Sequence, residues 1–549
     1  MCLKVPTLLY INGNGQLRKN LTILFLLFTA LTVNTRVFAE QLPQQLHFVI
    51  KKFEILGDNP ISASETNDVF QYYLGDHYGL EGIQAAATAY EEKLRKSGYA
   101  FYRVNLAPQK LEGGVIKLQL IQLKLDKVTV EGNQHFSKEN LMRNIPTLKS
   151  GESPNTRVLS RAINMADAHP SKSLKLQFSE NEEGGAINAT LKVTDIKPNF
   201  FFLSLNNTGN DETGNLRLTG GYQFTNLFDR DHNLSLSYTT SPDDLSAVQQ
   251  YGVSYTIPYY DIGSEINIFL ARSDVDSGVV AQSFSVSGAG TILLAHYKHT
   301  FLQKGAYKQQ LDVGLDHKLF ENDIGLVGIP GVTVDGSGDV LSRPISLAYI
   351  GFWQGAGNSI NFNVAGYTNI SGGSDNTDED YEQIRRGSSA DWTLFRYGFG
   401  YDQLIAENWF FRMNFLGQES SELLIPGEQF GIGGIYSVRG FDERALLGDS
   451  GIQANFELWL PGFSQYDIRP LVFFDYGHVE LNSPLSSETP SIDISSIGAG
   501  LRWSIINKLN VIVDVAYVTG GAEETNLPGS DDATEDGDVK AHIDVFYRF

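Results

Sequence analysis

The feature of this sequence that most constrains its fold is a long series of short alternating segments from about Pro198 to Phe549. In Asn510–Tyr517, one strand face would be apolar, whereas Asn510 and Asp514 would project from the opposite face. Such alternation over about ten residues is typical of transmembrane β-barrels, although a soluble β-sandwich alternates too. After residue 33, no stretch approaches the roughly 20 continuous apolar residues of a membrane-spanning helix.

Two features favour the barrel over the sandwich. Connection lengths near the C-terminus alternate, as expected for short periplasmic turns and long external loops. The short connections are 461–467 and 506–509, and the long ones are 418–451, 478–493 and 520–540. Tyr547 and the terminal Phe549 share one strand face, which resembles the sorting signal read by the outer-membrane assembly machinery. At roughly 20 to 22 residues per strand and connection, residues 198–549 predict an all-β transmembrane barrel of about 16 antiparallel strands.

Residues 1–39 are expected to be a cleaved signal peptide rather than an anchoring helix. Basic residues precede the apolar run Leu21–Val33, and Val37 and Ala39 occupy positions −3 and −1 of a cut before Glu40. The only cysteine, Cys2, would leave with the signal, so we expect neither disulfides nor thiol chemistry. An exported barrel predicts the outer membrane of a Gram-negative bacterium as the location.

A duplicated module separates the signal from the barrel. Val49–Asp58 indicates a strand ending in a glycine turn, and Leu125–Asn133 repeats the pattern about 75 residues later. Ser62 and Ser137 follow the two turns at the same offset. Each copy continues with helical stretches and two strands, an order that resembles the α+β POTRA domain of the periplasm. We expect these modules over residues 40–124 and 125–197.

Two motifs in the barrel region point to a family. In the long connection 418–451, four consecutive residues resemble the loop tip of the outer-membrane assembly and secretion superfamily: Val438, Arg439, Gly440 and Phe441. The next strand but one carries residues that resemble the Phe-x-Asp-x-Gly strand of that superfamily: Phe473, Asp475 and Gly477. Together with two POTRA-like modules, these motifs make the chain similar to the two-partner secretion transporters of the haemolysin activator type (the ShlB/FhaC/HecB family).

The resemblance implies a loop folded back into the barrel. A wide barrel has a wet interior unless something fills it, and an arginine fork on a carboxylate would anchor such a loop. Because charge facing lipid is costly, Asp475 is expected to point inward. The resemblance then implies that Arg439 pairs with Asp475, with Glu457 as a second candidate acceptor, and that Gly440 permits a tight turn. The alternative is that Arg439 is a solvated loop residue.

The first module carries a further resemblance to the family. Pro108 and Gln109 resemble the family's Pro-x-Gln stretch before the last strand of that module. Exposed strand edges could accept an unfolded partner exoprotein by β-augmentation, although the sequence does not say which edge. Only about ten residues separate Ala39 from the first strand, so a plug helix is expected to be absent.

The remaining expectations concern partners and alternative functions. The expected partners are the exoprotein, membrane lipid and, during biogenesis, the assembly machinery. A net charge of −22 argues against nucleic acid. Gly448–Gly451 mimics a serine-protease nucleophile without a partner histidine, so we expect no enzyme, cofactor or metal, and the acidic run Ser374–Glu382 reads as a solvated external loop. The main alternative is an outer-membrane protein assembly factor of the same superfamily; a diffusion porin or a surface enzyme fits the modules and motifs less well.

Overall fold

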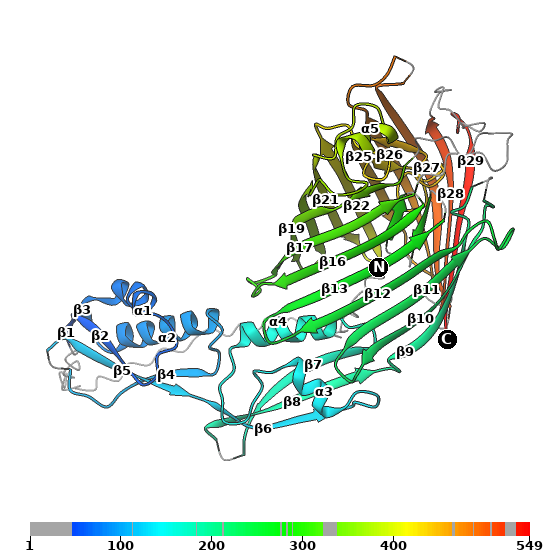
Figure 1. Ribbon diagram of the computed structural model, residues 1–549. Coiled ribbons are helices and arrows are strands. Elements are labelled where there is room, and N and C mark those ends of the chain that lie inside the picture. Colours follow the sequence, from blue (N-terminus) through cyan, green and yellow to red (C-terminus); the bar gives the residue numbers. More distant parts are fainter. Residues whose placement is uncertain are drawn as a thin grey trace, which may run out of the picture. The chain divides into compact units, whose positions relative to one another are not determined.

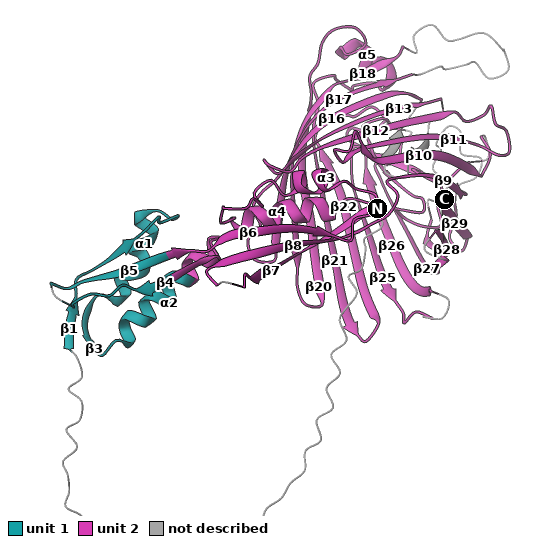
Figure 2. Ribbon diagram, turned by 90° about the horizontal axis from the view of Figure 1, so that it is seen from below, with its two compact units in different colours: residues 1–91, 104–120 teal, residues 92–103, 121–549 magenta. Residues whose placement is uncertain are grey.

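The computed structural model describes residues 47–111, 113–182, 184–210, 213–274, 277–280, 284–287, 289–321, 338–463, 467–486, 488–505, 508–521 and 534–549. The predicted signal peptide lies outside these residues. So does the short stretch after it, in which we expect no plug helix. The chain divides into two compact units (Figure 2), one of residues 1–91 with 104–120 and one of residues 92–103 with 121–549. No helix among the described residues is long and apolar enough to cross a membrane.

The first module has the predicted leading strand, helices and closing pair of strands, with a further strand, β3, between the two helices. Ser62 begins its first helix with a capping box, in which its side chain accepts from the backbone N–H of Glu65. Strands β2, β5 and β4 form one sheet in that order, and β1 pairs with β3. The elements are β1 (His47–Ile50), β2 (Lys52–Leu56), α1 (Ala63–Phe70), a 3₁₀ turn (Gln71–Tyr73), β3 (Gly75–Tyr78), α2 (Glu81–Lys96), β4 (Tyr102–Leu106) and β5 (Val115–Gln122).

The second module repeats this plan. Ser137 caps its first helix, as Ser62 does in the first module. Its sheet has the order β6, β8, β7, with β6 parallel and β7 antiparallel to the central strand. The apolar faces of the helices and the sheet bury one cluster around Leu141, Leu159 and Leu191. The elements are β6 (Lys124–Glu131), α3 (Lys138–Asn144), α4 (Thr156–Asp167), β7 (Lys172–Glu180) and β8 (Ala186–Asp195).

A closed antiparallel barrel follows (Figure 1) and confirms the predicted fold class. The described residues form 16 barrel strands if β18 and β19, which both pair with β17, are counted as one. These are β9 (Asn199–Asn206), β10 (Arg217–Leu227), β11 (His232–Thr240), β12 (Gln250–Tyr259), β13 (Ser264–Ser273), β16 (Gly290–Thr300), β17 (Tyr307–Phe320), β18 (Val340–Ser342), β19 (Pro344–Gln354), β20 (Asn358–Asn369), β21 (Thr393–Ala406), β22 (Trp409–Ser420), β25 (Ser450–Trp459), β26 (Ile468–Glu480), β27 (Ser491–Ile505), β28 (Leu509–Gly520) and β29 (Val539–Arg548).

Side-chain alternation gives the barrel an apolar exterior and a polar interior. On β26, Val472 and Phe474 are 43% and 41% exposed, whereas Asp475 between Phe474 and Tyr476 is fully buried. This is the arrangement expected of a wall with lipid outside, since a charge on the lipid face is costly. Two short strands, β14 (Ser277–Val280) and β15 (Phe284–Ser287), pair with each other in the connection between β13 and β16.

The second module is tied to the barrel through the turn between β10 and β11. Asp231 in this turn forms a fully buried ion pair with Lys172 at the start of β7. The carboxylate also accepts hydrogen bonds from Asn140 (2.9 Å), Asn144 (2.7 Å) and the Tyr260 hydroxyl (2.8 Å). A buried charge pair is tolerated when its remaining hydrogen-bonding groups are satisfied, so this junction holds one defined geometry.

His169 lies beside this ion pair and is buried in its neutral form. Its Nε2 lies 2.7 Å from the carbonyl oxygen of Thr225 on β10, and its Nδ1 accepts the N–H of Ser171 at 3.2 Å. Protonation of Nδ1 would remove the second bond. The pKa of His169 is lowered from 6.5 to about 4. Burial is the largest cause, and the positive charge of Lys172 adds to it by more than the negative charge of Asp231 opposes it.

We therefore expect the junction to weaken in acid. The unfolded histidine binds a proton near pH 6.5 while the folded one does not, so stability is full above pH 6.5 and falls as the pH drops towards 4. The loss between pH 7 and pH 5 should be about 2 kcal/mol. Hydrogen exchange of residues 168–176 in the full chain, corrected for intrinsic rates, measures it. His169→Gln should remove most of this pH dependence, and an equal slope in both proteins would contradict the assignment.

Candidate functional site

The long connection between β22 and β25 folds as a hairpin against the inner wall of the barrel. Its stem pairs β23 (Phe430–Ile432) with β24 (Leu446–Gly448). Apolar residues of the loop and the wall form one buried cluster, which seats the loop by removing apolar surface from water. The cluster consists of Ile432, Val438, Phe441 and Leu446 of the loop with Val479, Ile494 and Val518 of the wall. We call residues 421–449 the lumen loop.

Arg439 at the tip of the lumen loop lies among three wall carboxylates. Its Nε and Nη2 donate to the two oxygens of Asp475 at 2.6 and 2.8 Å, and Nη1 donates to Glu457 at 2.9 Å. Asp514 Oδ2 lies 3.5 Å from Nη1. The guanidinium also stacks over the ring of Phe473, 3.5 Å from its centroid. Arg439 is 3% exposed and Asp475 is fully buried, so the fork is bidentate and screened from water.

Further polar groups fix Asp475 and its neighbours. Asp475 accepts the backbone N–H of Arg439 at 3.2 Å and the amide of Asn455 at 2.8 Å. Glu457 accepts the indole N–H of Trp459 at 2.8 Å, and Arg502 forms a bidentate pair with Asp514 at 2.6 and 2.9 Å. These bonds satisfy further lone pairs of the same carboxylates, which lowers the cost of burying the charges.

Two glycines permit the close approach of loop and wall. A Cβ at Gly477 would lie 2.8 Å from Ile432 Cδ1 and 2.9 Å from Val438 Cγ2, both closer than real contacts allow. Gly440 has a φ of 102°, a left-handed conformation that side chains disfavour. The first glycine provides space and the second provides the turn.

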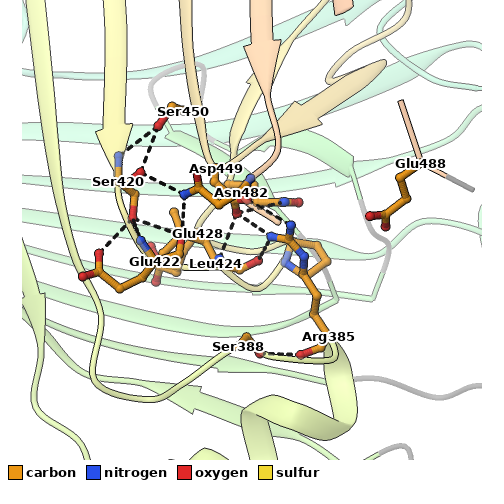
Figure 3. A network of polar contacts seen from close by, with 12 residues as sticks. Arg385, Ser388, Ser420, Glu422, Leu424, Glu428, Asp449, Ser450, Asn482 and Glu488 are labelled. Atoms are coloured by element: carbon orange, nitrogen blue, oxygen red, sulfur yellow. Dashed lines mark hydrogen bonds and ion pairs between the residues drawn. The ribbon is translucent and has the colours of Figure 1, made fainter. Parts of the chain in front are cut away.

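The root of the lumen loop is anchored by a second polar network (Figure 3). Asp449 is fully buried, forms an ion pair with Arg385, and accepts the backbone N–H groups of Leu424 and Asn482 at 2.8 and 2.7 Å. Lys318 forms an ion pair with Glu428 at 3.0 Å. Both the root and the tip of the loop are therefore held by charged groups.

Arg385 follows the helix α5 (Asp378–Ile384), which corrects one expectation. The acidic run Ser374–Glu382 was expected to be a plain solvated loop. Most of its acidic side chains are exposed, but Thr377 caps a helix with Asp380, and Tyr381 is fully buried. The buried aromatic, together with Trp392 and Leu424, packs this segment onto the loop root.

The structure brings together the residues of the two motifs. Val438, Arg439, Gly440 and Phe441 meet the wall at Phe473, Asp475, Gly477 and Glu457. Sequence reasoning did not nominate Asp514 or Arg502, although Asp514 stood on the polar face of its predicted strand. It also missed Asp449, because the Gly448–Gly451 pattern was considered only as a mimic of a serine-protease nucleophile. Which inward carboxylate meets the loop depends on strand register, which the sequence pattern leaves open.

The other nominated residues lie elsewhere. The side chain of Gln109 bonds both backbone groups of Lys117 on β5, at 2.8 Å to the N–H and 2.7 Å to the carbonyl oxygen, while Pro108 is exposed. Gln109 thus continues the ladder beyond the end of β4. Tyr547 and Phe549 are exposed on the outer face, and the backbone of Phe549 pairs with Phe201.

Comparisons with known proteins agree on one family. The model of the haemolysin secretion/activation protein ShlB/FhaC/HecB matches residues 185–503, and that of the ShlB-type POTRA domain matches residues 48–122. The heme/hemopexin transporter protein HuxB of Haemophilus influenzae (strain 86-028NP) is 23% identical, covering 87% of this chain and 85% of HuxB. The outer membrane transporter CdiB of Escherichia coli O6:K15:H31 is 23% identical over 80% and 75% of the two chains. The solved CdiB structure from Escherichia coli has a TM-score of 0.75 at 18% identity, covering 94% of this chain and 93% of that one.

Removing the Arg439 guanidinium should release the tip of the lumen loop. Arg439→Met would leave Asp475 and Glu457 buried without their cation, at a cost of about 3 to 5 kcal/mol to the docked state. Hydrogen exchange of residues 430–448 should then quicken by at least about 100-fold. The matched control is Lys298→Met, which breaks the partly exposed pair with Glu265 (3.1 Å) between β16 and β13 and should leave that exchange nearly unchanged. Equal exchange in Arg439→Met and wild type, with the barrel folded, would contradict the anchoring role.

Proposed function

Because the chain belongs to the haemolysin secretion/activation family ShlB/FhaC/HecB, we propose that its lumen loop controls the passage of an exported protein through the barrel. The chain is an outer-membrane transporter of two-partner secretion that delivers a partner exoprotein to the cell surface, with its N-terminal modules in the periplasm. The family match favours this function over the assembly-factor alternative of the same superfamily.

One observation carries the proposal: Arg439 is bound by Asp475 and Glu457 inside a closed barrel. A loop held in this way occupies space that a translocating chain needs. The bonds are charge-assisted, yet each partner is a side chain that water or a passing chain can replace once the loop leaves. The docked loop is therefore the resting state, and its release opens the route.

Capture of the exoprotein is assigned to the strand edges of the modules. Strand β7 is the edge strand of the sheet β6, β8, β7, and its second half, from Gln177 to Glu180, is exposed. The N–H of Leu174 donates to Asp167 at 3.0 Å rather than to β8. Since alternate residues of a strand point their N–H groups to the same side, the N–H of Phe178 faces outward as well. An unfolded chain can add to such an edge through backbone bonds.

Two further elements complete the proposal. The periplasm offers no nucleotide, so folding of the exoprotein outside the cell provides the direction of transport. During biogenesis, Tyr547 and Phe549 on the outer face of the last strand are read by the assembly machinery, and the apolar exterior then contacts lipid.

A reversible lock tests the role of the loop. The double variant Ile432→Cys with Gly477→Cys joins loop to wall. A Cβ at Gly477 would lie 3.4 Å from Ile432 Cβ, close to the Cβ–Cβ separation of a disulfide, and the change removes the Ile432 Cδ1 that this Cβ would meet at 2.8 Å. The mature chain has no cysteine if the predicted signal is removed with Cys2. Surface delivery of the partner exoprotein should stop in oxidised cells and return with reductant. The reduced double variant and the single variant Ile432→Cys serve as the controls. Undiminished delivery by the oxidised double variant would overturn the proposal.

A comparison of two substitutions at Phe178 tests the capture edge. Phe178→Pro removes the outward N–H, whereas Phe178→Ala removes only the ring that packs against Phe101. Loss of one backbone hydrogen bond, about 0.5 to 1.5 kcal/mol, should weaken binding of the unfolded exoprotein roughly 3- to 10-fold in the proline variant relative to the alanine variant. Titration of the purified full-length transporter measures both affinities. Equal affinities of the two variants would exclude this edge.

A further inference from the structure

The tip of the lumen loop makes a second set of contacts, with the last barrel strand. Three alternate residues of β29, Lys540, His542 and Asp544, share its inward face and each binds the tip. The Tyr436 hydroxyl donates to Asp544 Oδ2 at 3.0 Å, and the backbone N–H of Gly440 donates to His542 Nε2 at 2.9 Å. Lys540 forms an ion pair with Asp442.

The strand that receives these contacts is the one that closes the barrel. β29 pairs with β28 through nine residue pairs but with β9 through only five, from Asp544 with Asn206 to Arg548 with Phe202. The first half of β29 therefore lies beyond the regular ladder with β9. There, Asn207 makes the remaining bonds: its side chain bonds the carbonyl oxygen of Ala541 at 2.7 Å and the N–H of Ile543 at 2.8 Å, and its backbone N–H donates to the carbonyl oxygen of Ile543 at 3.3 Å.

The tip thus binds the part of β29 that β9 holds least. Lys540 and His542 lie in the unladdered half, and Asp544 lies at the last regular pair. Asp544 also accepts the hydroxyl of Ser204 on β9 at 3.2 Å, so this one carboxylate joins the loop tip, β29 and β9.

We infer that Lys540, His542 and Asp544 are positioning residues that couple the lumen loop to the β29–β9 seam. While the loop is docked, its tip holds the first half of β29 in place through these contacts. When the loop leaves, the first half of β29 is held on that side by the Asn207 bonds, and the barrel widens at this part of the seam. This inference rests on the proposed function, because it describes what loop release does to the pore.

Spin labels across the seam test the coupling in the full chain. Ile543 and Leu205 are exposed on the outer face, and Ile543 lies two residues from Val545, the register partner of Leu205, so labelled cysteines there report the separation of β29 from β9. The variant Tyr436→Phe with His542→Ala should add a population with a longer label distance, in which the two strands lie one further strand spacing apart, about 5 Å. Asp544→Asn provides a second variant should the double variant fold poorly. Tyr297→Phe, which removes a hydroxyl bond on the distant wall between β16 and β13 (2.7 Å), is the matched control and should keep the wild-type distribution.

A second comparison separates this inference from the proposed function. Arg439→Met should also widen the seam, because it releases the tip. If exchange of residues 430–448 shows the loop released while the labels keep the wild-type distance, the coupling is overturned and the role of the loop in transport stands. If the double variant keeps the wild-type distance, the coupling is likewise overturned. If the disulfide-locked loop allows normal export, the proposed function fails, whatever the seam labels show.

Discussion

The structure depends on one buried cation and the carboxylates around it. A barrel of this width has a wet interior, and a loop reaching into it gains little from weak surface contacts. The bidentate fork from Arg439 to Asp475, completed by Glu457 and by the ring of Phe473, gives the tip a single position. Because each charge is desolvated, the site is stable as a whole and costly when one member is lost. A loop with this property has two states, docked and released, which is what a transporter needs of its gate.

The rest of unit 2 is built to keep that loop in register. Asp449 and Glu428 hold its root by ion pairs with Arg385 and Lys318. These two basic residues are distant in the sequence from the residues that bind Arg439. At the opposite end of the strands, the Lys172–Asp231 pair fixes the second module to a barrel turn. Rigid attachment at both ends leaves the loop tip and the seam beside it as the places where a limited rearrangement changes the pore.

Much of this architecture can be predicted from local pattern. The alternation of β26 places Asp475 on the inner face because Phe474 and Tyr476 require the outer one, and a fixed repeat separates the two modules. Pairwise contacts are harder to predict. Asp514 and Asp475 both face inward, and only the stagger of four strands decides that the first lies 3.5 Å from Arg439 and the second 2.6 Å. The partnership of Gly440 with His542 joins residues 102 positions apart through a backbone N–H that no side-chain pattern reveals. The burial of Tyr381 was not predicted, because it is one aromatic residue within a run of acidic residues that resembles a solvated loop.

The central claim is that the Arg439–Asp475 pair holds the loop in the barrel, and a double-mutant cycle tests it most directly. Hydrogen exchange of residues 430–448 gives the free energy of loop opening in wild type, Arg439→Met, Asp475→Asn and the double variant. We predict a coupling energy of about 2 to 4 kcal/mol, because the two charges are buried and bonded to each other. Additive effects, with a coupling energy below about 0.5 kcal/mol, would show that the two residues act independently and would contradict the account.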